Sequence, residues 1–297
     1  MRTRISTFLG LLCVALAAGT AVASRHEIRF DRPAKPGERL RLSAKGSSTI
    51  RNSMVLGGQT LREESEGVRI DLEAVVEVLE VNERGGVEKK TLKIARLVYG
   101  ASGEPDRTIP PGSVITAEAT ETGTEFELEG GELSELAVEA LGIVVETDSK
   151  NLPRDDETFG SVDPRVVGES WSVDREVSAR ALGAVGVPIE PDQIDGTITL
   201  VGVEQSEGLE CLRIRGDVKF AEFPLGASEP GGQLEASRAQ ATFSRLLPTD
   251  LGIGMLYELS SFRVESSVNV NEGPMTGALV EISFVKNREA RTVPVRE

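Results

Sequence analysis

The stretch VRIDLEAVVEVLEVNERGGVEKKTLKIARLVY, residues 68–99, decides the fold class. Apolar and polar residues alternate through 68–78, which is the period of a half-buried β-strand. The phase of this alternation changes at Leu79 and Val81, and a β-bulge there accounts for the slip. The segment 82–86 has the composition of a turn, and a second apolar-rich run follows it. The stretch therefore predicts a long antiparallel hairpin over 68–99.

The same pattern returns in the second half of the chain. Alternating residues on both sides of a turn at 206–208 predict a second hairpin over 197–220. Three further strands are expected over 234–245, 255–270 and 277–287. Polar residues of one parity in the alternating stretches 256–261 and 262–267 predict a solvated face, which antiparallel sheets allow. The predicted fold class is mainly β, with long antiparallel meanders that form one or two curved open sheets or half-barrels.

One helix is expected among these strands, at about 132–141. Its apolar residues recur at the spacing of a single helical face; they are Leu133, Leu136, Ala137, Ala140 and Leu141. Gly142 follows, and glycine commonly ends a helix. Because an apolar stripe needs cover, we expect the helix to lie against a sheet.

Two strand openings resemble each other and suggest a two-part organisation. PGERLRL (36–42) and VGESWSV (167–173) correspond at an offset of 131, and each precedes a long hairpin. We hypothesise an internal duplication. The predicted domains are 24–145, a first β-meander with the helix, and 167–297, a second β-meander. An acidic, Pro-containing linker over 146–166 separates them.

The first 23 residues have the pattern of a cleavable signal peptide. Two arginines precede an apolar run at 8–18, and a small-x-small sequence ends at Ala23, which predicts cleavage between Ala23 and Ser24. The run is shorter than the roughly 20 apolar residues that a membrane span needs, so no integral span is expected after removal. The predicted location is exported: periplasmic, cell-envelope or extracellular.

Removal of the signal makes the chain more acidic. The signal holds 2 of the 33 basic residues and none of the 48 acidic ones, so the net charge changes from −15 to −17. This charge excludes a nucleic acid as partner, because binding there depends on neutralising phosphates. It also disfavours adsorption to an anionic membrane. Of the two cysteines, Cys13 leaves with the signal, and Cys211 is expected to be buried as a small apolar residue.

The chain lacks the side chains that most catalytic mechanisms need. His26 is the only histidine, and we expect it on a mobile terminus, where it cannot support a Ser-His relay or a zinc site. The Ser283-x-x-Lys286 match to a serine–lysine dyad falls in a strand, where these residues point to opposite faces. No phosphate-binding glycine motif is present. No catalytic or cofactor-binding residue is therefore predicted.

Carboxylates leave two alternatives open. A carboxylate-dependent secreted hydrolase would need two acids that converge in a cleft, one of them with a raised pKa. A calcium-stabilised adhesion or scaffold module would need several oxygen ligands in loops. The candidates for calcium are Asp155, Asp156, Asp163, Asp192 and Asp195, although their spacing fits no known calcium loop. Trp171 is expected in the core, with ligand stacking as the alternative.

Two segments carry a resemblance to known proteins. The strand opening Gly168-Glu169-Ser170-Trp171 and the stretch 241–254 are similar to uncharacterised exported, often lipoprotein-type, β-rich bacterial proteins. The resemblance implies an envelope location and an open, curved sheet, but it transfers no catalytic residue. A lipidation cysteine is lacking here. We expect an exported non-enzymatic envelope protein, binding or structural, whose partner is an envelope ligand or protein; an apolar ligand in the concavity of the sheet is one option.

Overall fold

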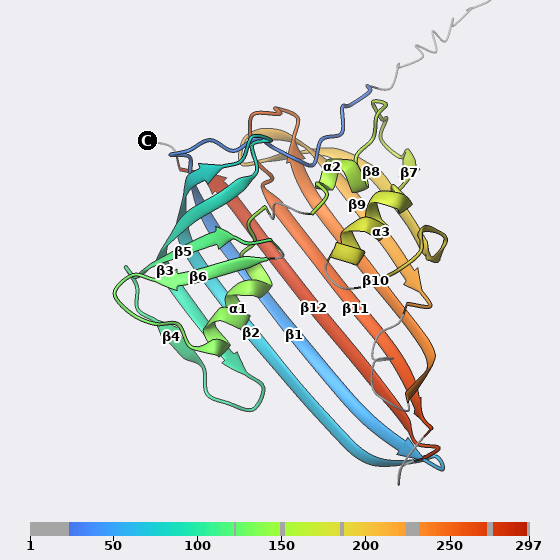
Figure 1. The fold of residues 1–297 in the computed structure, drawn as a ribbon. Helices are drawn as coiled ribbons and strands as arrows, with labels where there is room; N and C mark the ends of the chain where they lie inside the picture. Colours follow the sequence, from blue (N-terminus) through green and yellow to red (C-terminus); the bar gives the residue numbers. More distant parts are fainter. Residues whose placement is uncertain are drawn as a thin grey trace, which may run out of the picture.

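The computed structural model describes residues 24–121, 123–148, 152–184, 187–223, 232–271 and 276–295, with backbone only at 232–235. These residues form one open antiparallel sheet of 12 strands with helices on one side (Figure 1). The elements are β1 (Arg39–Leu56), β2 (Gln59–Val81), β3 (Val87–Ala101), β4 (Arg107–Ile109), β5 (Val114–Ala119), β6 (Thr124–Leu128), α1 (Glu135–Val144), α2 (Asp155–Phe159), β7 (Ser170–Ser172), α3 (Arg175–Ala184), the 3-10 turn η1 (Pro191–Gln193), β8 (Ile194–Ser206), β9 (Leu209–Ala221), β10 (Gly232–Pro248), β11 (Tyr257–Val270) and β12 (Leu279–Pro294).

The strand order is β6-β5-β3-β2-β1-β12-β11-β10-β9-β8-β7, with β4 beside β3. The expected mainly β fold of long antiparallel meanders is confirmed. The hairpin predicted over 68–99 is β2–β3, and its register shifts near Glu80, where the bulge was expected. In its turn, the Asn82 side-chain oxygen accepts the N–H groups of Arg84 (3.0 Å) and Gly86 (2.8 Å).

The second half also follows the sequence pattern. The hairpin expected over 197–220 is β8–β9, and its turn residues Glu207 and Gly208 both have positive φ. Strands β10, β11 and β12 occupy the three C-terminal stretches, and β12 continues to Pro294.

Strand β1 joins the two halves into a single sheet. It pairs with β2 on one side and with β12 on the other, from Leu40 opposite Pro294 to Val55 opposite Leu279. The sequence predicted the start of this strand but not its eighteen residues. One continuous sheet, rather than two, therefore results.

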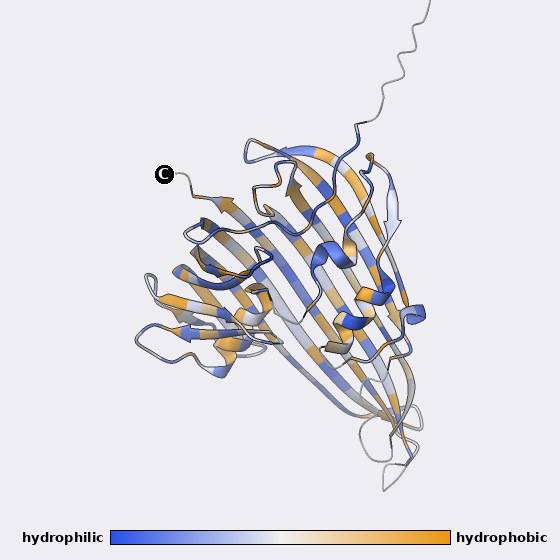
Figure 2. Cartoon of the chain, turned by 45° about the horizontal axis from the view of Figure 1, so that its top comes forward, coloured by the Kyte–Doolittle hydropathy of each residue, from blue (hydrophilic) through white to orange (hydrophobic). Residues whose placement is uncertain are grey.

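The sheet has one covered and one solvated face. The register places Ala44 beside Leu72 and Ala290, and Ala290 beside Glu258, so these side chains share one face. We call it the inner face, because α1, α2 and α3 lie on it (Figures 1 and 2). Arg263 and its polar neighbours of the same parity lie on the opposite, outer face, as predicted.

Two apolar cores lie side by side on the inner face. The first packs α1 against β1, β2, β3 and β5, and the second packs α2, α3 and the N-terminal segment against β8, β9 and β10. Gly46 shows how close α1 comes to the sheet: a Cβ on this residue would lie 2.4 Å from Ile143 Cγ2. Only glycine permits this approach.

Helix α1 begins and ends three residues later than predicted. Ser134 caps its first turn, since the hydroxyl oxygen accepts the N–H of Ala137 at 3.3 Å. The expectation that Gly142 ends the helix is wrong, because the helix continues through it to Val144. Ile143 and Val144 are buried against the sheet, and this packing outweighs the weak helix propensity of glycine.

The two corresponding strand openings have the same backbone geometry. Gly37 and Gly168 have φ values of 82° and 90°. Each donates its N–H to a carbonyl of the neighbouring strand at 2.8 Å. The side chains of Glu38 and Glu169 each accept the N–H of the residue three positions earlier, at 3.2 Å and 3.0 Å.

The correspondence ends after these openings. Strand β1 has 18 residues, whereas β7 has 3 and is followed by α3. Each half orders its first strands as a meander, and the internal duplication stays a hypothesis. The stretch expected to be a linker, 146–166, contains α2, whose Phe159 lies 5.2 Å from the Phe243 ring of β10.

Candidate functional site

A cleft of about 920 Å³ lies on the inner face between the two apolar cores. The β2–β3 turn, residues 145–148 and residues 152–155 line it. Its floor is formed by side chains of β10, β11 and β12. We call it the central cleft.

Three acidic and basic side chains form the floor: Arg245, Glu258 and Arg288. Glu258 is 5% exposed and lies 3.0 Å from Arg245 and 3.3 Å from Arg288, which are 13% and 15% exposed. Arg245 also pairs with Asp155 of α2, and Arg288 lies 2.6 Å from Glu146 beyond α1. The network therefore connects the covers of both cores through the centre of the sheet.

Attraction between opposite charges favours the ionised forms of Arg245, Arg288 and Glu146. Burial disfavours the charge on Arg245, but the attraction of Asp155 and Glu258 outweighs it and raises the pKa of Arg245. Burial likewise acts against the Glu146 carboxylate, yet Arg288 and Lys286 hold its pKa below the usual value. Lys90, at the edge of the network, is different: burial, with repulsion from Arg288, lowers its pKa to about 8.

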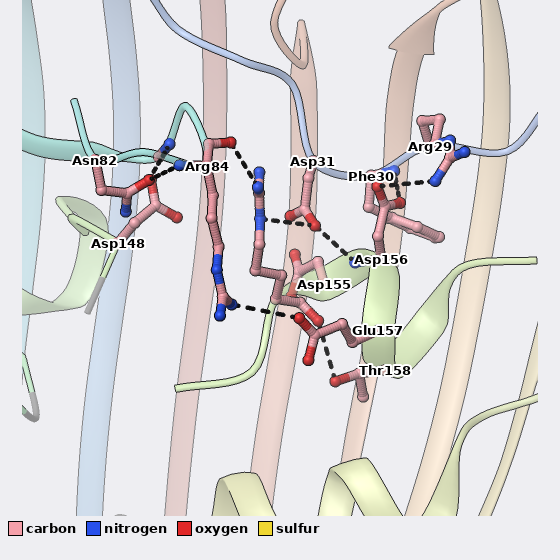
Figure 3. Close-up of polar contacts among 12 residues, drawn as sticks. Arg29, Phe30, Asp31, Asn82, Arg84, Asp148, Asp155, Asp156, Glu157 and Thr158 are labelled. Atoms are coloured by element: carbon pink, nitrogen blue, oxygen red, sulfur yellow. Dashed lines mark hydrogen bonds and ion pairs between the residues drawn. The ribbon is translucent and has the colours of Figure 1, made fainter. Parts of the chain in front are cut away.

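The N-terminal segment is tied to α2 at the rim of the cleft (Figure 3). The N–H of Phe30 donates to Asp156 Oδ1 at 2.6 Å, and the N–H of Asp156 donates to Asp31 Oδ2 at 3.1 Å. Arg154 Nε lies 3.0 Å from the same Asp31 oxygen. Burial nevertheless raises the pKa of Asp31 to about 6, because the Asp156 N–H and Arg154 offset only part of the desolvation.

The inner face of β12 changes character next to the cleft. Its successive inner residues are Arg288, Lys286, Phe284, Ile282 and Val280. The half-buried rings of Phe284 and Phe262 on β11 meet edge to face at 6.3 Å. Ile50 on β1, opposite Phe284, is 44% exposed. We call Phe284, Ile282, Val280, Phe262, Ile50 and Met54 the apolar strip.

The aspartates considered for calcium are not brought together. Asp155 binds Arg245, and Asp156 accepts from Phe30. Asp163 lies exposed in a loop, Asp192 lies exposed in η1, and Asp195 lies 3.4 Å from Arg175 at the start of β8. Within the part of the chain that the structure describes, no three His, Cys, Asp or Glu residues are grouped as a metal ion requires.

Other residues singled out in the sequence have structural roles. Trp171 is 8% exposed in the second core, and its indole N–H donates to the Phe159 carbonyl at 2.8 Å. Cys211 is fully buried, and burial raises its thiol pKa. The expected mobility of His26 is wrong, because two backbone hydrogen bonds of 2.8 Å hold it to Arg165.

Two remaining positions complete the comparison with the sequence. Ser283 and Lys286 lie on opposite faces of β12, as expected for a chance motif match. Of the predicted cleavage site, Ala23 lies outside the described residues, and Ser24 is the first described residue.

The network on the cleft floor was not identified from the sequence. A signal was present: Glu258 and Arg245 lie at the inner-facing parity of strands whose other inner residues include Phe243, Phe262 and Val264 as well as serines. Charged residues on an apolar parity rarely occur without partners. Which partners they have depends on strand register, which alternation alone does not supply.

Comparisons with known proteins give no family. No family model and no curated protein matches the chain. Among solved structures, lipovitellin, studied for its lipid–protein interactions, aligns with 91% of this chain and 26% of its own length, with 11% identity and a TM-score of 0.33. An outer membrane channel from Pseudomonas putida F1 aligns with 90% of this chain and 99% of its own, with 9% identity and a TM-score of 0.20. OprG, an outer membrane protein from Pseudomonas aeruginosa, aligns with 89% of this chain and 100% of its own, with 6% identity and a TM-score of 0.15.

This chain thus spans about a quarter of the lipovitellin chain. Likenesses this weak carry no argument about function, so the proposals below rest on geometry. Among the described residues, no helix has the length and apolar composition needed to cross a membrane.

Proposed function

We propose that this chain is an exported, non-enzymatic binding protein of the cell envelope whose ligand occupies the central cleft. The observation that carries the proposal is the cleft of about 920 Å³ left between two closed cores. This volume lies in the range of small-molecule sites. Export rests on the signal-like composition of residues 1–23.

A binding role is favoured over a purely structural one because the cleft is not filled. A scaffold gains stability by packing its interior to high density. Here the two cores are well packed, yet the space between them is lined by ionised side chains, including Arg288 and Glu146, and is open to a ligand.

One observation favours the carboxylate-dependent hydrolase as a second candidate. Asp31 and Asp155 both line the cleft, and the Asp31 pKa is raised to about 6. A carboxyl group with a raised pKa near a second carboxyl group is a feature of glycoside hydrolases. However, Asp31 is engaged by Arg154 and by the Asp156 N–H, which suits a structural latch. The test is hydrolysis of chromogenic glycosides. If the wild type hydrolyses them and Asp31→Asn does not, the hydrolase replaces the binding protein as the proposed function.

Gly142 provides the test of the binding proposal. It lines the cleft from α1, and a Cβ there would meet no atom within 4 Å. We expect Gly142→Leu to place its side chain in the cleft, since the backbone accepts a Cβ there without a clash. Gly183 of α3 is a matched control, because its Cβ would also meet nothing and it lies away from the cleft. Each change should stabilise its helix by about 1 kcal/mol.

The measurement is native mass spectrometry of the protein purified from its own host. We expect wild type and Gly183→Leu to carry the same small molecule at one per chain, and Gly142→Leu to lack it. Equal loading of all three proteins, or no ligand on the wild type, would contradict the proposal.

A further inference from the structure

Lys286 stands at the border between the central cleft and the apolar strip. In the register of the sheet it lies between Ser48 of β1 and Phe262 of β11, and Phe284 is the next inner residue of its own strand. Its ammonium donates one hydrogen bond, to the Gly142 carbonyl at 3.2 Å. Two of its three N–H groups have no protein acceptor among the described residues.

Lys286 has no close ion-pair partner among the described residues, although the Glu146 carboxylate attracts it from farther away. Among the described residues that line the cleft, the arginines each have a carboxylate within 4 Å: Arg84, Arg154, Arg245 and Arg288. No carboxylate of the described residues lies within 4 Å of Lys286. Beside it on the inner face, Nε of Arg288 is buried without a hydrogen-bond partner.

The Lys286 ammonium and the Arg288 Nε–H both have hydrogen-bond donors without an acceptor among the described residues. They are two residues apart on β12, so they lie on the same face about 7 Å apart. A buried donor without an acceptor is costly, and charged donors bind anionic oxygens more strongly than neutral ones. An anion placed between the floor of the cleft and Lys286 would offer acceptors to these donors.

The surface beyond Lys286 has the opposite character. Beyond Lys286 the inner residues of β12 are Phe284, Ile282 and Val280, and Val280 lies roughly 20 Å from Lys286 at the rise of a strand. Ile50, Phe262 and Phe284 border this path and are not fully buried. An apolar chain laid along it would cover side chains that water now reaches. A small polar anion would leave this strip uncovered.

We infer that the ligand is an anionic amphiphile, with a phosphate or carboxylate head at Lys286 and Arg288 and an acyl chain on the apolar strip. The inference rests on the proposed binding function and specifies its ligand class. The positive charges of Lys286 and Arg288 favour an anionic head group. The apolar residues that follow Lys286 on the inner face of β12 favour an acyl chain as the tail. Neutral or cationic amphiphiles and free anions are the competing occupants.

The test measures the binding of dodecyl phosphate by calorimetry below its micelle concentration. Dodecyltrimethylammonium and inorganic phosphate are the comparison probes. Lys286→Met removes the charge and keeps the aliphatic stem. Lys45→Met is its control, because Lys45 lies on the outer face of the adjacent strand and is 67% exposed.

A second pair of variants tests the tail. Ile50→Asp places a charge on the apolar strip, and Leu259→Asp places one on the outer face at nearly equal exposure, 47% against 44%. We expect Lys286→Met and Ile50→Asp to weaken dodecyl phosphate binding by about tenfold or more, and the two controls to leave it unchanged. Inorganic phosphate should bind far more weakly, with a dependence on Lys286 but not on Ile50.

The outcomes separate this inference from the proposed function. Equal binding of the cationic amphiphile, no effect of Lys286→Met, or equally tight binding of inorganic phosphate would each overturn the anionic amphiphile. The function proposal would still stand if Gly142→Leu removed the ligand that the host protein carries. If Gly142→Leu also failed to remove that ligand, both the anionic amphiphile and the proposed binding function would be overturned.

Discussion

Glu258→Gln is the most informative single substitution in the network on the cleft floor. The change keeps the shape of the side chain and removes its charge, which leaves Arg245 and Arg288 without their shared carboxylate. Breaking a buried ion pair costs about 3–5 kcal/mol, because a charge stays buried without its partner. Each arginine keeps one other carboxylate, Asp155 or Glu146. We therefore expect a loss near the lower limit, about 3 kcal/mol.

Glu265→Gln is the matched control. Glu265 lies on the outer face of the same strand and also has two arginine partners, Arg238 and Arg263. These arginines are 78% and 61% exposed, so water screens the pairs. The cost should be below about 1 kcal/mol.

The assay is urea unfolding followed by circular dichroism, with thermal unfolding beside it. A loss of about 3 kcal/mol corresponds to a decrease in Tm of roughly 6–12 °C for a chain of this size. Equal losses for Glu258→Gln and Glu265→Gln would refute the reasoning, since it attributes the difference to burial alone.

Two further predictions concern the rim of the cleft and helix α1. The folded pKa of Asp31 is about 6 against 3.8 for the free group, so the native state binds the proton more tightly and stability falls as pH rises from about 4 to 6; this shift is worth about 3 kcal/mol. Asp31→Asn should remove that dependence. The measurement is the difference between the urea unfolding midpoints at pH 4 and pH 7. An equal difference in the variant and in the wild type would contradict the prediction. Ser134→Ala removes the hydrogen bond that caps α1 and should cost about 1 kcal/mol in urea unfolding, whereas Ser134→Thr, which keeps the hydroxyl, should cost little; equal losses would exclude the cap.

The strands were predictable because alternation is a local property. Residues 68–99 and 197–220 show which parity is apolar, and the structure places those parities on the inner face. The limits of α1 were less predictable, since its last turn is held by contacts of Ile143 and Val144 with Gly46, almost 100 residues earlier in the chain.

The candidate site was hidden for the same reason. Glu258 and Arg245 meet because β10 and β11 pair in one particular register, and Arg288 joins them from β12. Asp155 and Glu146 reach the network from segments at least 90 residues away in sequence from their arginine partners. No pattern within any one of these segments predicts the others.

The sequence alone therefore determined the β-rich class, the positions of the long hairpins, and the absence of the histidines and cysteines that most catalytic sites need. Only the tertiary structure decided that β1 pairs with β12 to make one sheet, and that a charged cleft separates two apolar cores. The physical reason is range: side-chain alternation is set by neighbours along the chain, whereas strand order and charge pairing are set by contacts between residues up to about 250 positions apart.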